Sequence, residues 1–167
     1  MKITSSAFED NQKIPDKYTC DGENINPSLE FENIPDNAKS LSLIMEDPDV
    51  PKDLRADGMF DHWVVFNIPP EIISIEENSE PLGIVGQNTR GDSKYTGPCP
   101  PDRKHRYFFK LFALDVILDL DSSATKKDVE KAMAGHMLDK AELMGIYERW
   151  LLPLDSLVVY WYKKITL

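Results

Sequence analysis

The sequence predicts a mainly β domain, on three observations. Apolar side chains recur at the period of two that is typical of strands in residues 40–47, 61–69 and 105–115. Only one stretch, residues 125–137, repeats its apolar side chains clearly at helical spacing. Prolines and other turn formers fill the segments between these stretches. A chain of this length is expected to fold as one domain, residues 1–167.

Composition narrows the class of protein. Apolar residues make up 41% of the chain and charged residues 29%, as in ordinary globular domains. The net charge of -10 argues against partners such as nucleic acid and anionic membrane surfaces. The chain has no run of about 20 apolar residues that could span a membrane, and its first residues lack the apolar stretch of a signal peptide. We therefore expect a cytoplasmic protein in which Cys20 and Cys99 are thiols, although both lie in turn-rich segments and could be close together.

The first third of the chain alternates between short strands and turns. Residues 2–7 predict an edge strand, residues 10–26 predict a long loop because turn formers crowd there, and residues 28–31 are extended. Residues 40–47 predict a strand with three apolar side chains on one face. Asp47 ends that same face, so a carboxylate is expected at the rim of the core.

The next strand, residues 61–69, is apolar on both faces, which is typical of a central strand. By alternation, His62 begins the face that continues with Val64, Phe66 and Ile68. A polar side chain therefore stands again at the end of an apolar face.

Residues 71–104 predict a long loop with a short strand at 83–85, and a compact domain seldom carries such a loop without a function. The end of this loop is stiffened by prolines and leads into the strand of residues 105–115. His105 and Tyr107 begin an apolar face of that strand. A rigid loop therefore delivers two hydrogen-bonding rings to the end of a strand, as at the mouth of a pocket.

The last third of the chain contains the predicted helix. Thr125 and Asp128 form a capping-box pattern, and we interpret His136, on the apolar stripe, as a structural residue. Residues 141–149 fit either a strand or a second helix. Residues 157–162 predict a strand with two apolar faces. This tail either packs on its own domain or lines a homodimer interface, and we favour the homodimer.

If the strand of residues 40–47 runs antiparallel to the other two, the side chains of Asp47, His62 and His105 meet at one end of the core, with Asp49 and Tyr107 nearby. These side chains fit a metal site less well than an anion pocket, because no HxH or HxxxH pair provides closely spaced ligands. Serine hydrolase chemistry fits poorly, because the chain lacks a GxSxG elbow. An anion pocket fits best: imidazolium, phenol and loop amides donate hydrogen bonds to phosphate oxygens. The carboxylates would keep the imidazoles protonated or pair with a ligand ammonium.

Several motifs of the chain resemble those of a known family. The motifs are YTCDGENINPSLEF at 18–31, DPDVP at 47–51, DHWVVFNIP at 61–69, GPCPPDRKHRYFFKLFALD at 97–115 and AELMGIYER at 141–149. They are similar to phosphatidylethanolamine-binding proteins, and in particular to the bacterial and archaeal Raf kinase inhibitor-like branch. Several motifs in the same order make the resemblance specific.

The resemblance implies a β-sandwich of two sheets with one or two peripheral helices and a small anion pocket. Carried over position by position, the ligand-binding residues are Asp47, Asp49, Pro51, His62, Gly97, Pro98, His105 and Tyr107. Two features depart from the family pattern. Arg90 stands where relatives usually carry an aromatic residue, and residues 149–167 extend the chain at its C-terminus.

The resemblance also implies a function. We expect a binding or regulatory protein that takes a small phosphorylated ligand or a phospholipid head group, without a cofactor or a metal, and that modulates a kinase or a protease. Because one fold serves several functions, the alternative is a hydrolase that acts on a small phosphate ester or lipid through the histidine and aspartate pocket.

Overall fold

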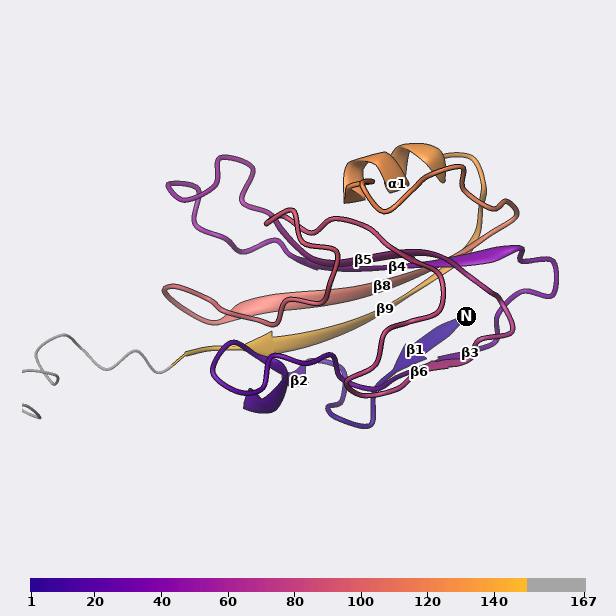
Figure 1. Ribbon diagram of the computed structural model, residues 1–167. Coiled ribbons are helices and arrows are strands. Elements are labelled where there is room, and N and C mark those ends of the chain that lie inside the picture. Colours follow the sequence, from indigo (N-terminus) through magenta and orange to yellow (C-terminus); the bar gives the residue numbers. More distant parts are fainter. Residues whose placement is uncertain (150–167) are drawn as a thin grey trace, which may run out of the picture.

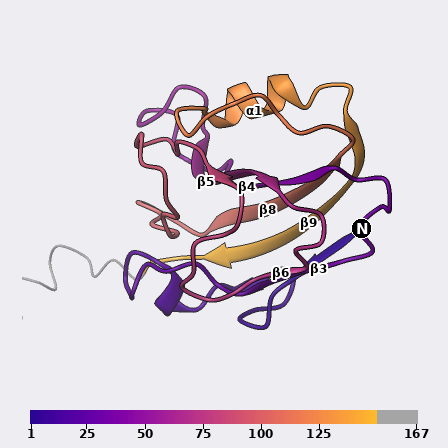
Figure 2. The same cartoon turned by 45° about the vertical axis from the view of Figure 1, so that its right-hand side comes forward.

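The computed structural model describes residues 1–149 and shows a β-sandwich of two sheets, which confirms the predicted fold class. The smaller sheet has the strand order β1-β3-β6 and the larger one β2-β9-β8-β4-β5-β7. Helix α1 covers one face of the larger sheet, and the smaller sheet lies on the other (Figures 1 and 2). The elements are β1 (Lys2–Thr4), β2 (Gln12–Lys13), a 3-10 helix (Asp16–Tyr18), β3 (Leu29–Glu32), β4 (Ser40–Asp47), β5 (Phe60–Ile68), β6 (Ser74–Ile75), β7 (Ile84–Val85), β8 (His105–Leu114), α1 (Lys126–Ala132) and β9 (Met137–Tyr147).

The centre of the larger sheet has the pairing that the sequence argument assumed. Strand β4 pairs antiparallel with both β5 and β8, and β8 pairs antiparallel with β9. The end of β4 and the starts of β5 and β8 therefore lie at the same edge of the sandwich. Residues 141–149 fall largely within β9, so the alternative of a second helix there is wrong. Strand β7 falls within the short strand predicted at 83–85, and the predicted long loops also contain β2 and β6; each of the three is only two residues long.

The larger sheet separates two apolar cores. The side chains of Leu43, Met45 and Phe109 are fully buried in the core between the sheets. Those of Ile44 and Val129 are fully buried in a second core, between the larger sheet and α1. Burying one such side chain stabilises the fold by about 1.5–3 kcal/mol. Because both faces of β4 are packed, the direction of each side chain at its end is fixed.

The predicted helix begins as expected and ends earlier. The main-chain amide of Thr125 donates a hydrogen bond to the Asp128 carboxylate at 2.9 Å, which confirms the capping box. The helix ends at Ala132, and Gly135 then adopts a φ of 83°, a backbone conformation that favours glycine. His136 lies after this turn and not on the helix. Its Nδ1 atom is 2.9 Å from a carboxylate oxygen of Asp115.

Two predictions concern other parts of the chain. Within residues 1–149, the structure contains no helix that is both long and apolar enough to cross a membrane. The predicted strand at residues 157–162, and the homodimer interface proposed for it, lie outside the described residues.

Candidate functional site

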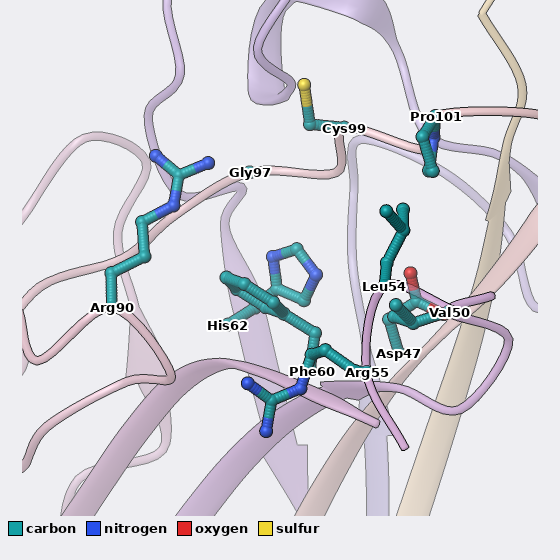
Figure 3. Close-up of a pocket in the computed structure, with 10 residues that line it drawn as sticks. All are labelled: Asp47, Val50, Leu54, Arg55, Phe60, His62, Arg90, Gly97, Cys99 and Pro101. Carbon is teal, nitrogen blue, oxygen red and sulfur yellow. The ribbon is translucent and has the colours of Figure 1, made fainter. Parts of the chain in front are cut away.

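A cavity of about 280 Å³ opens at the edge where β4 ends and β5 begins (Figure 3). Two loops complete its walls, one between β4 and β5 and the other leading into β8. The lining residues are Asp47, Val50, Leu54, Arg55, Phe60, His62, Arg90, Gly97, Cys99 and Pro101. The cavity therefore combines apolar walls with a carboxylate, an imidazole and two guanidinium groups.

Asp47 forms the buried polar end of the cavity. Its carboxylate accepts a hydrogen bond from the Asp49 amide at 2.8 Å and lies 2.7 Å from Nδ1 of His105. Burial raises the pKa of Asp47 even though both contacts oppose that rise. The other ring nitrogen of His105 lies 2.9 Å from an oxygen of Asp102. Both nitrogens of His105 are thus occupied by carboxylates, and the ring supports Asp47 from behind without lining the cavity.

A β-bulge brings His62 to the cavity. In the pairing of β4 with β5, Trp63 lies opposite Met45 but Asp61 lies opposite Glu46, so His62 is the extra residue. A bulge turns its extra residue away from the regular alternation of the strand. His62 therefore lines the same cavity as Asp47, on the side of the sheet away from α1.

The predicted alternation that puts His62 on one face with Val64 and Phe66 is therefore wrong, although the expected position of His62 near Asp47 is confirmed. Val64 and Phe66, which were expected on the same face as His62, pack under α1 instead. Nδ1 of His62 lies 2.6 Å from the carbonyl oxygen of Thr96, and burial lowers the pKa of His62 to about 4. Burial therefore favours the neutral ring at this position, in contrast to the imidazolium that the sequence led us to expect.

Tyr107 lies beside both histidines. Its ring is 5.3 Å from the ring of His62 and 6.5 Å from that of His105, measured between centroids. The hydroxyl is buried and makes no hydrogen bond of good geometry within residues 1–149, although Asp47 and the main chain of Cys99 lie near it. Burial and the charge of Asp47 both raise the pKa of Tyr107, so the hydroxyl keeps its proton. A buried hydroxyl without a well-formed hydrogen bond is unusual in a native protein and calls for an explanation, such as a bound water or a ligand.

Asp49 and Pro51 shape the loop between β4 and β5, but neither lines the cavity. The Asp49 carboxylate accepts two hydrogen bonds from the guanidinium of Arg106, at 2.7 and 2.8 Å, and this pairing lowers the pKa of Asp49. The carbonyl oxygen of Pro51 accepts hydrogen bonds from the amides of Leu54 and Arg55, both at 3.0 Å. The resulting turn carries Leu54 and Arg55 to the cavity.

Gly97 lies where two loops touch. A Cβ atom at this position would lie 2.3 Å from the carbonyl oxygen of Tyr18, which explains why the residue is glycine. Its amide donates a hydrogen bond to the Asn24 side chain at 2.7 Å. The next residue, Pro98, does not line the cavity, but its carbonyl oxygen accepts a hydrogen bond from the Cys20 amide at 3.1 Å.

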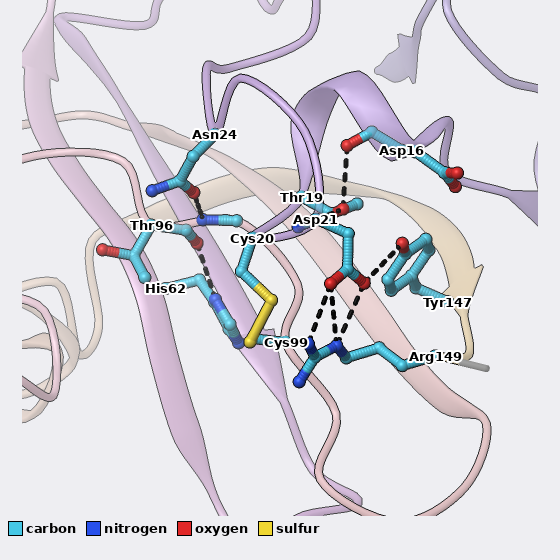
Figure 4. Close-up of a disulfide and its surroundings, with 11 residues drawn as sticks. Asp16, Thr19, Cys20, Asp21, Asn24, His62, Thr96, Cys99, Tyr147 and Arg149 are labelled. Atoms are coloured by element: carbon cyan, nitrogen blue, oxygen red, sulfur yellow. Dashed lines mark hydrogen bonds and ion pairs between the residues drawn. A yellow bond between two sulfur atoms is a disulfide. The ribbon is translucent and has the colours of Figure 1, made fainter. Parts of the chain in front are cut away.

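Cys20 and Cys99 form a disulfide, so the expectation of two thiols is wrong (Figure 4). The two cysteines are 79 residues apart in the sequence, and their Cα atoms are 5.4 Å apart. Sequence spacing could not reveal this pairing, because it depends on how two long loops meet. The bond fixes the loop that contains Gly97 against the N-terminal loop, and Cys99 itself lines the cavity.

Several lining residues were not predicted from the sequence. Arg90 was noted only as a departure from the family pattern. Val50 lies inside the DPDVP motif, Leu54 and Phe60 lie close to the predicted motifs, and the apolar character of these three residues at loop positions is the one available signal. In the part of the chain that the structure describes, no group of three or more His, Cys, Asp or Glu residues is arranged to hold a metal ion.

Comparisons with known proteins agree on one family. A family model described as phosphatidylethanolamine-binding protein matches residues 4–148. Proteins named UPF0098 from Chlamydia pneumoniae and Methanothermobacter thermautotrophicus are each 48% identical to this chain, over 89% of its length and 99% of theirs.

Two solved structures are also similar. A putative phosphatidylethanolamine-binding protein homologue from Chlamydia trachomatis has a TM-score of 0.87 and 47% identity, and the match covers 89% of this chain and 97% of that protein. YbcL of Escherichia coli, described as a member of the mammalian family, has a TM-score of 0.80 and 27% identity over 89% of this chain and 98% of its own.

Proposed function

Because the chain belongs to the phosphatidylethanolamine-binding protein family, we propose that it is a binding protein whose cavity takes a small phosphate-bearing ligand, such as a phosphoethanolamine-type head group. The observation that supports the proposal is the cavity, where apolar walls surround a few convergent polar groups. Its volume of about 280 Å³ is below the usual range for drug-sized ligands, which favours a ligand of head-group size.

The lining suits such a ligand chemically. The guanidinium groups of Arg55 and Arg90 at the mouth are donors of the kind that bind phosphate oxygens. Asp47 offers a carboxylate to a ligand ammonium, and Val50 and Leu54 offer apolar contact to the hydrocarbon part. Each part of a phosphoethanolamine-type ligand therefore has a complementary group in one small cavity.

Calorimetric titration of the purified protein with O-phosphoethanolamine at pH 7 tests the proposal. We expect saturable binding that Asp47→Asn weakens, whereas Asp53→Asn, an exposed change of equal charge in the same loop, leaves it unchanged. A melting curve checks that each variant is folded. No binding to the wild type at millimolar ligand contradicts the proposal.

Hydrolysis is the alternative, and the site offers it less support. The thiol of Cys99 is used in the disulfide. Among residues 1–149, no side-chain hydroxyl makes a hydrogen bond to either His62 or His105. Phosphatase and lipase assays on the wild type and on His105→Ala decide the matter: activity that disappears in the variant would establish an enzyme.

Three further expectations remain predictions. The cytoplasmic location rests on sequence alone, and the Cys20–Cys99 bond removes one of its supports, because disulfides persist mainly in oxidising compartments. Modulation of a kinase or a protease rests on the resemblance to the family.

The homodimer rests on the apolar pattern of the C-terminal tail. Light scattering of a chain truncated after Arg149 tests it: a monomer that keeps its fold would place the tail at the interface.

A further inference from the structure

The disulfide joins two loops that also hold each other without it. The amide of Cys20 donates a hydrogen bond to the carbonyl oxygen of Pro98 at 3.1 Å, and the amide of Gly97 donates to the Asn24 side chain at 2.7 Å. The hydroxyl of Tyr95 donates to a carbonyl oxygen of the same N-terminal loop at 2.8 Å. Because these contacts do not involve the sulfur atoms, the two cysteines remain neighbours after reduction and are placed to form the bond again.

The bond is accessible from solvent through one of its two residues. Cys20 is exposed, whereas Cys99 is half-buried in the cavity wall. An external thiolate therefore reaches the sulfur of Cys20, and Cys99 is the leaving group. Exposed disulfides are commonly the labile or regulatory ones, because thiol–disulfide exchange depends on access to a sulfur atom.

The bond also lies beside the contacts that hold the end of β9. Asp21 follows Cys20 directly in the sequence. Its carboxylate accepts a hydrogen bond from the Tyr147 hydroxyl at 2.9 Å and lies 2.9 Å from Nη2 of Arg149 (Figure 4). Tyr147 is the last residue of β9, and Arg149 begins the C-terminal extension. A change in the position of Cys20 is therefore passed directly to the residue that anchors the last strand.

We propose that Cys20 and Cys99 form a reversible thiol–disulfide exchange site whose redox state sets how firmly Asp21 holds the end of β9. The reaction partner is a dithiol reductant. One sulfur of the dithiol bonds to Sγ of Cys20 while Cys99 leaves as a thiolate, and its second sulfur then displaces Cys20. Two electrons and two protons pass to the protein, and the dithiol leaves as a disulfide. This inference concerns the two loops and does not depend on the proposed ligand.

Reversible exchange on the folded full-length protein is the first test. The protein is reduced with dithiothreitol at pH 7, freed of the reductant and then treated with oxidised glutathione. Alkylation with iodoacetamide and intact mass spectrometry count the free thiols before and after each step. We expect none, then two, then none, with a cooperative melting curve throughout. Reduction that requires urea, loss of the melting transition on reduction, or failure to recover the bond would each overturn the proposed site.

The two single variants test which sulfur is attacked. Cys99→Ser leaves the exposed Cys20, and Cys20→Ser leaves the half-buried Cys99. Ellman's reagent should react several-fold faster with the thiol of Cys20 than with that of Cys99, because the reactivity of a thiol increases with its exposure. Equal rates, or a faster reaction at Cys99, would overturn the assignment of Cys20 as the residue attacked.

Hydrogen exchange followed by mass spectrometry tests the link to β9. Reduction of the wild type should speed exchange in peptides that cover residues 145–149 by about tenfold, the factor that corresponds to loss of a hydrogen bond to a charged group. Peptides of β4 should not change, because that strand lies in the centre of the larger sheet. Equal exchange of residues 145–149 in both redox states, or faster exchange in β4 as well, would overturn the link.

Asp21→Asn and a matched control show whether Asp21 transmits the effect. In Asp21→Asn, residues 145–149 should exchange rapidly in both redox states, because the charged anchor is already lost. Glu23→Gln removes one charge from an exposed position of the same loop, and this variant should respond to reduction as the wild type does. A redox response that persists in Asp21→Asn would overturn the role of Asp21.

Discussion

Glu46 and Asp47 are neighbours on β4, yet their carboxylates lie on opposite faces of the larger sheet and in opposite electrostatic situations. On the face that α1 covers, Glu46 is held by Lys110 and Lys126, each with an N–O distance of 2.6 Å. Burial raises the pKa of Glu46, but these two lysines outweigh it, and the net shift is downward. Burial of Asp47 outweighs its hydrogen bonds, and the net shift is upward.

The pair Asp61 and His62 on β5 repeats the arrangement on two faces but not the net shift, because burial outweighs the lysine at Asp61 and raises its pKa. Asp61 lies 3.3 Å from Nζ of Lys126 on the covered face, whereas His62 faces the cavity with no charged partner at hydrogen-bond distance. On the covered face, lysines from neighbouring elements outweigh burial at Glu46 and compensate Asp61 in part. On the open face, no lysine or arginine within residues 1–149 forms an ion pair with Asp47, whose one such contact is with His105. Incomplete compensation costs stability, and it is common where a ligand completes the set of contacts. We infer that the covered cluster serves the fold and that the open one serves binding.

Removing the shared lysine of the covered face tests this inference with the largest expected effect. Lys126→Met leaves Glu46 with one cation and Asp61 with none. We expect the free energy of unfolding to fall by about 3–5 kcal/mol, because a buried charge loses its partner. Lys127→Met, at the exposed neighbouring position, is the control. Urea denaturation measures both, and affinity for O-phosphoethanolamine should stay constant. A loss below about 0.5 kcal/mol would show that the covered cluster is not structural.

The disulfide gives the next largest effect, on the open side. Closing a loop of 79 residues restricts the unfolded chain, so Cys20→Ser combined with Cys99→Ser should lower the free energy of unfolding by about 2–4 kcal/mol. Unlike Lys126→Met, this variant should also weaken ligand binding, because Cys99 is part of the cavity wall. Reductant should bring the wild type to the stability of the double variant and leave the variant unchanged. Affinity that survives the loss of the bond would show that the wall holds without it.

The neutral ring of His62 should make stability depend on pH. The pKa of an unfolded histidine is about 6.5, and burial lowers that of His62 to about 4. The unfolded chain then binds more protons between these values, so the stability is complete at about pH 7.5 and is lost as the pH falls through 6.5 towards 4. Between pH 6.5 and pH 5 the loss is about 1.6 kcal/mol.

His62→Asn keeps an N–H group near the Thr96 carbonyl and cannot titrate. Over the same pH range, the free energy of unfolding of the wild type should therefore fall further than that of the variant, by about the loss given above. Urea denaturation at several pH values measures both. If the free energy of unfolding changes equally with pH in variant and wild type, the buried His62 ring is charged in the folded protein. The contrast between the two faces would then weaken.

The strands of the larger sheet could be predicted from sequence because each depends on local alternation. Residues 40–47 coincide with β4, and the capping box at Thr125 marks the start of α1. The position of His62 could not be derived in this way, because a bulge depends on the register with the partner strand. The disulfide and the role of Arg55 depend on loops that meet only in the folded chain. Prediction therefore succeeded for elements set by neighbours in sequence and failed for contacts set by loop packing.

Tyr107 gives the smallest expected change in stability and a sharp test of the open face. Tyr107→Phe removes a buried hydroxyl that makes no hydrogen bond of good geometry within residues 1–149, so the variant should be as stable as the wild type or more stable by about 1 kcal/mol. If the hydroxyl is kept for a ligand, affinity for O-phosphoethanolamine should fall in the same variant by about tenfold. Higher stability with lower affinity is the combination expected of a group retained for binding.

Tyr95→Phe is the matched control. It also removes a buried tyrosine hydroxyl, but this hydroxyl donates a hydrogen bond to a carbonyl oxygen at 2.8 Å, so the variant should be less stable than the wild type. Lower stability of Tyr107→Phe with unchanged affinity would show that Tyr107 acts only in packing.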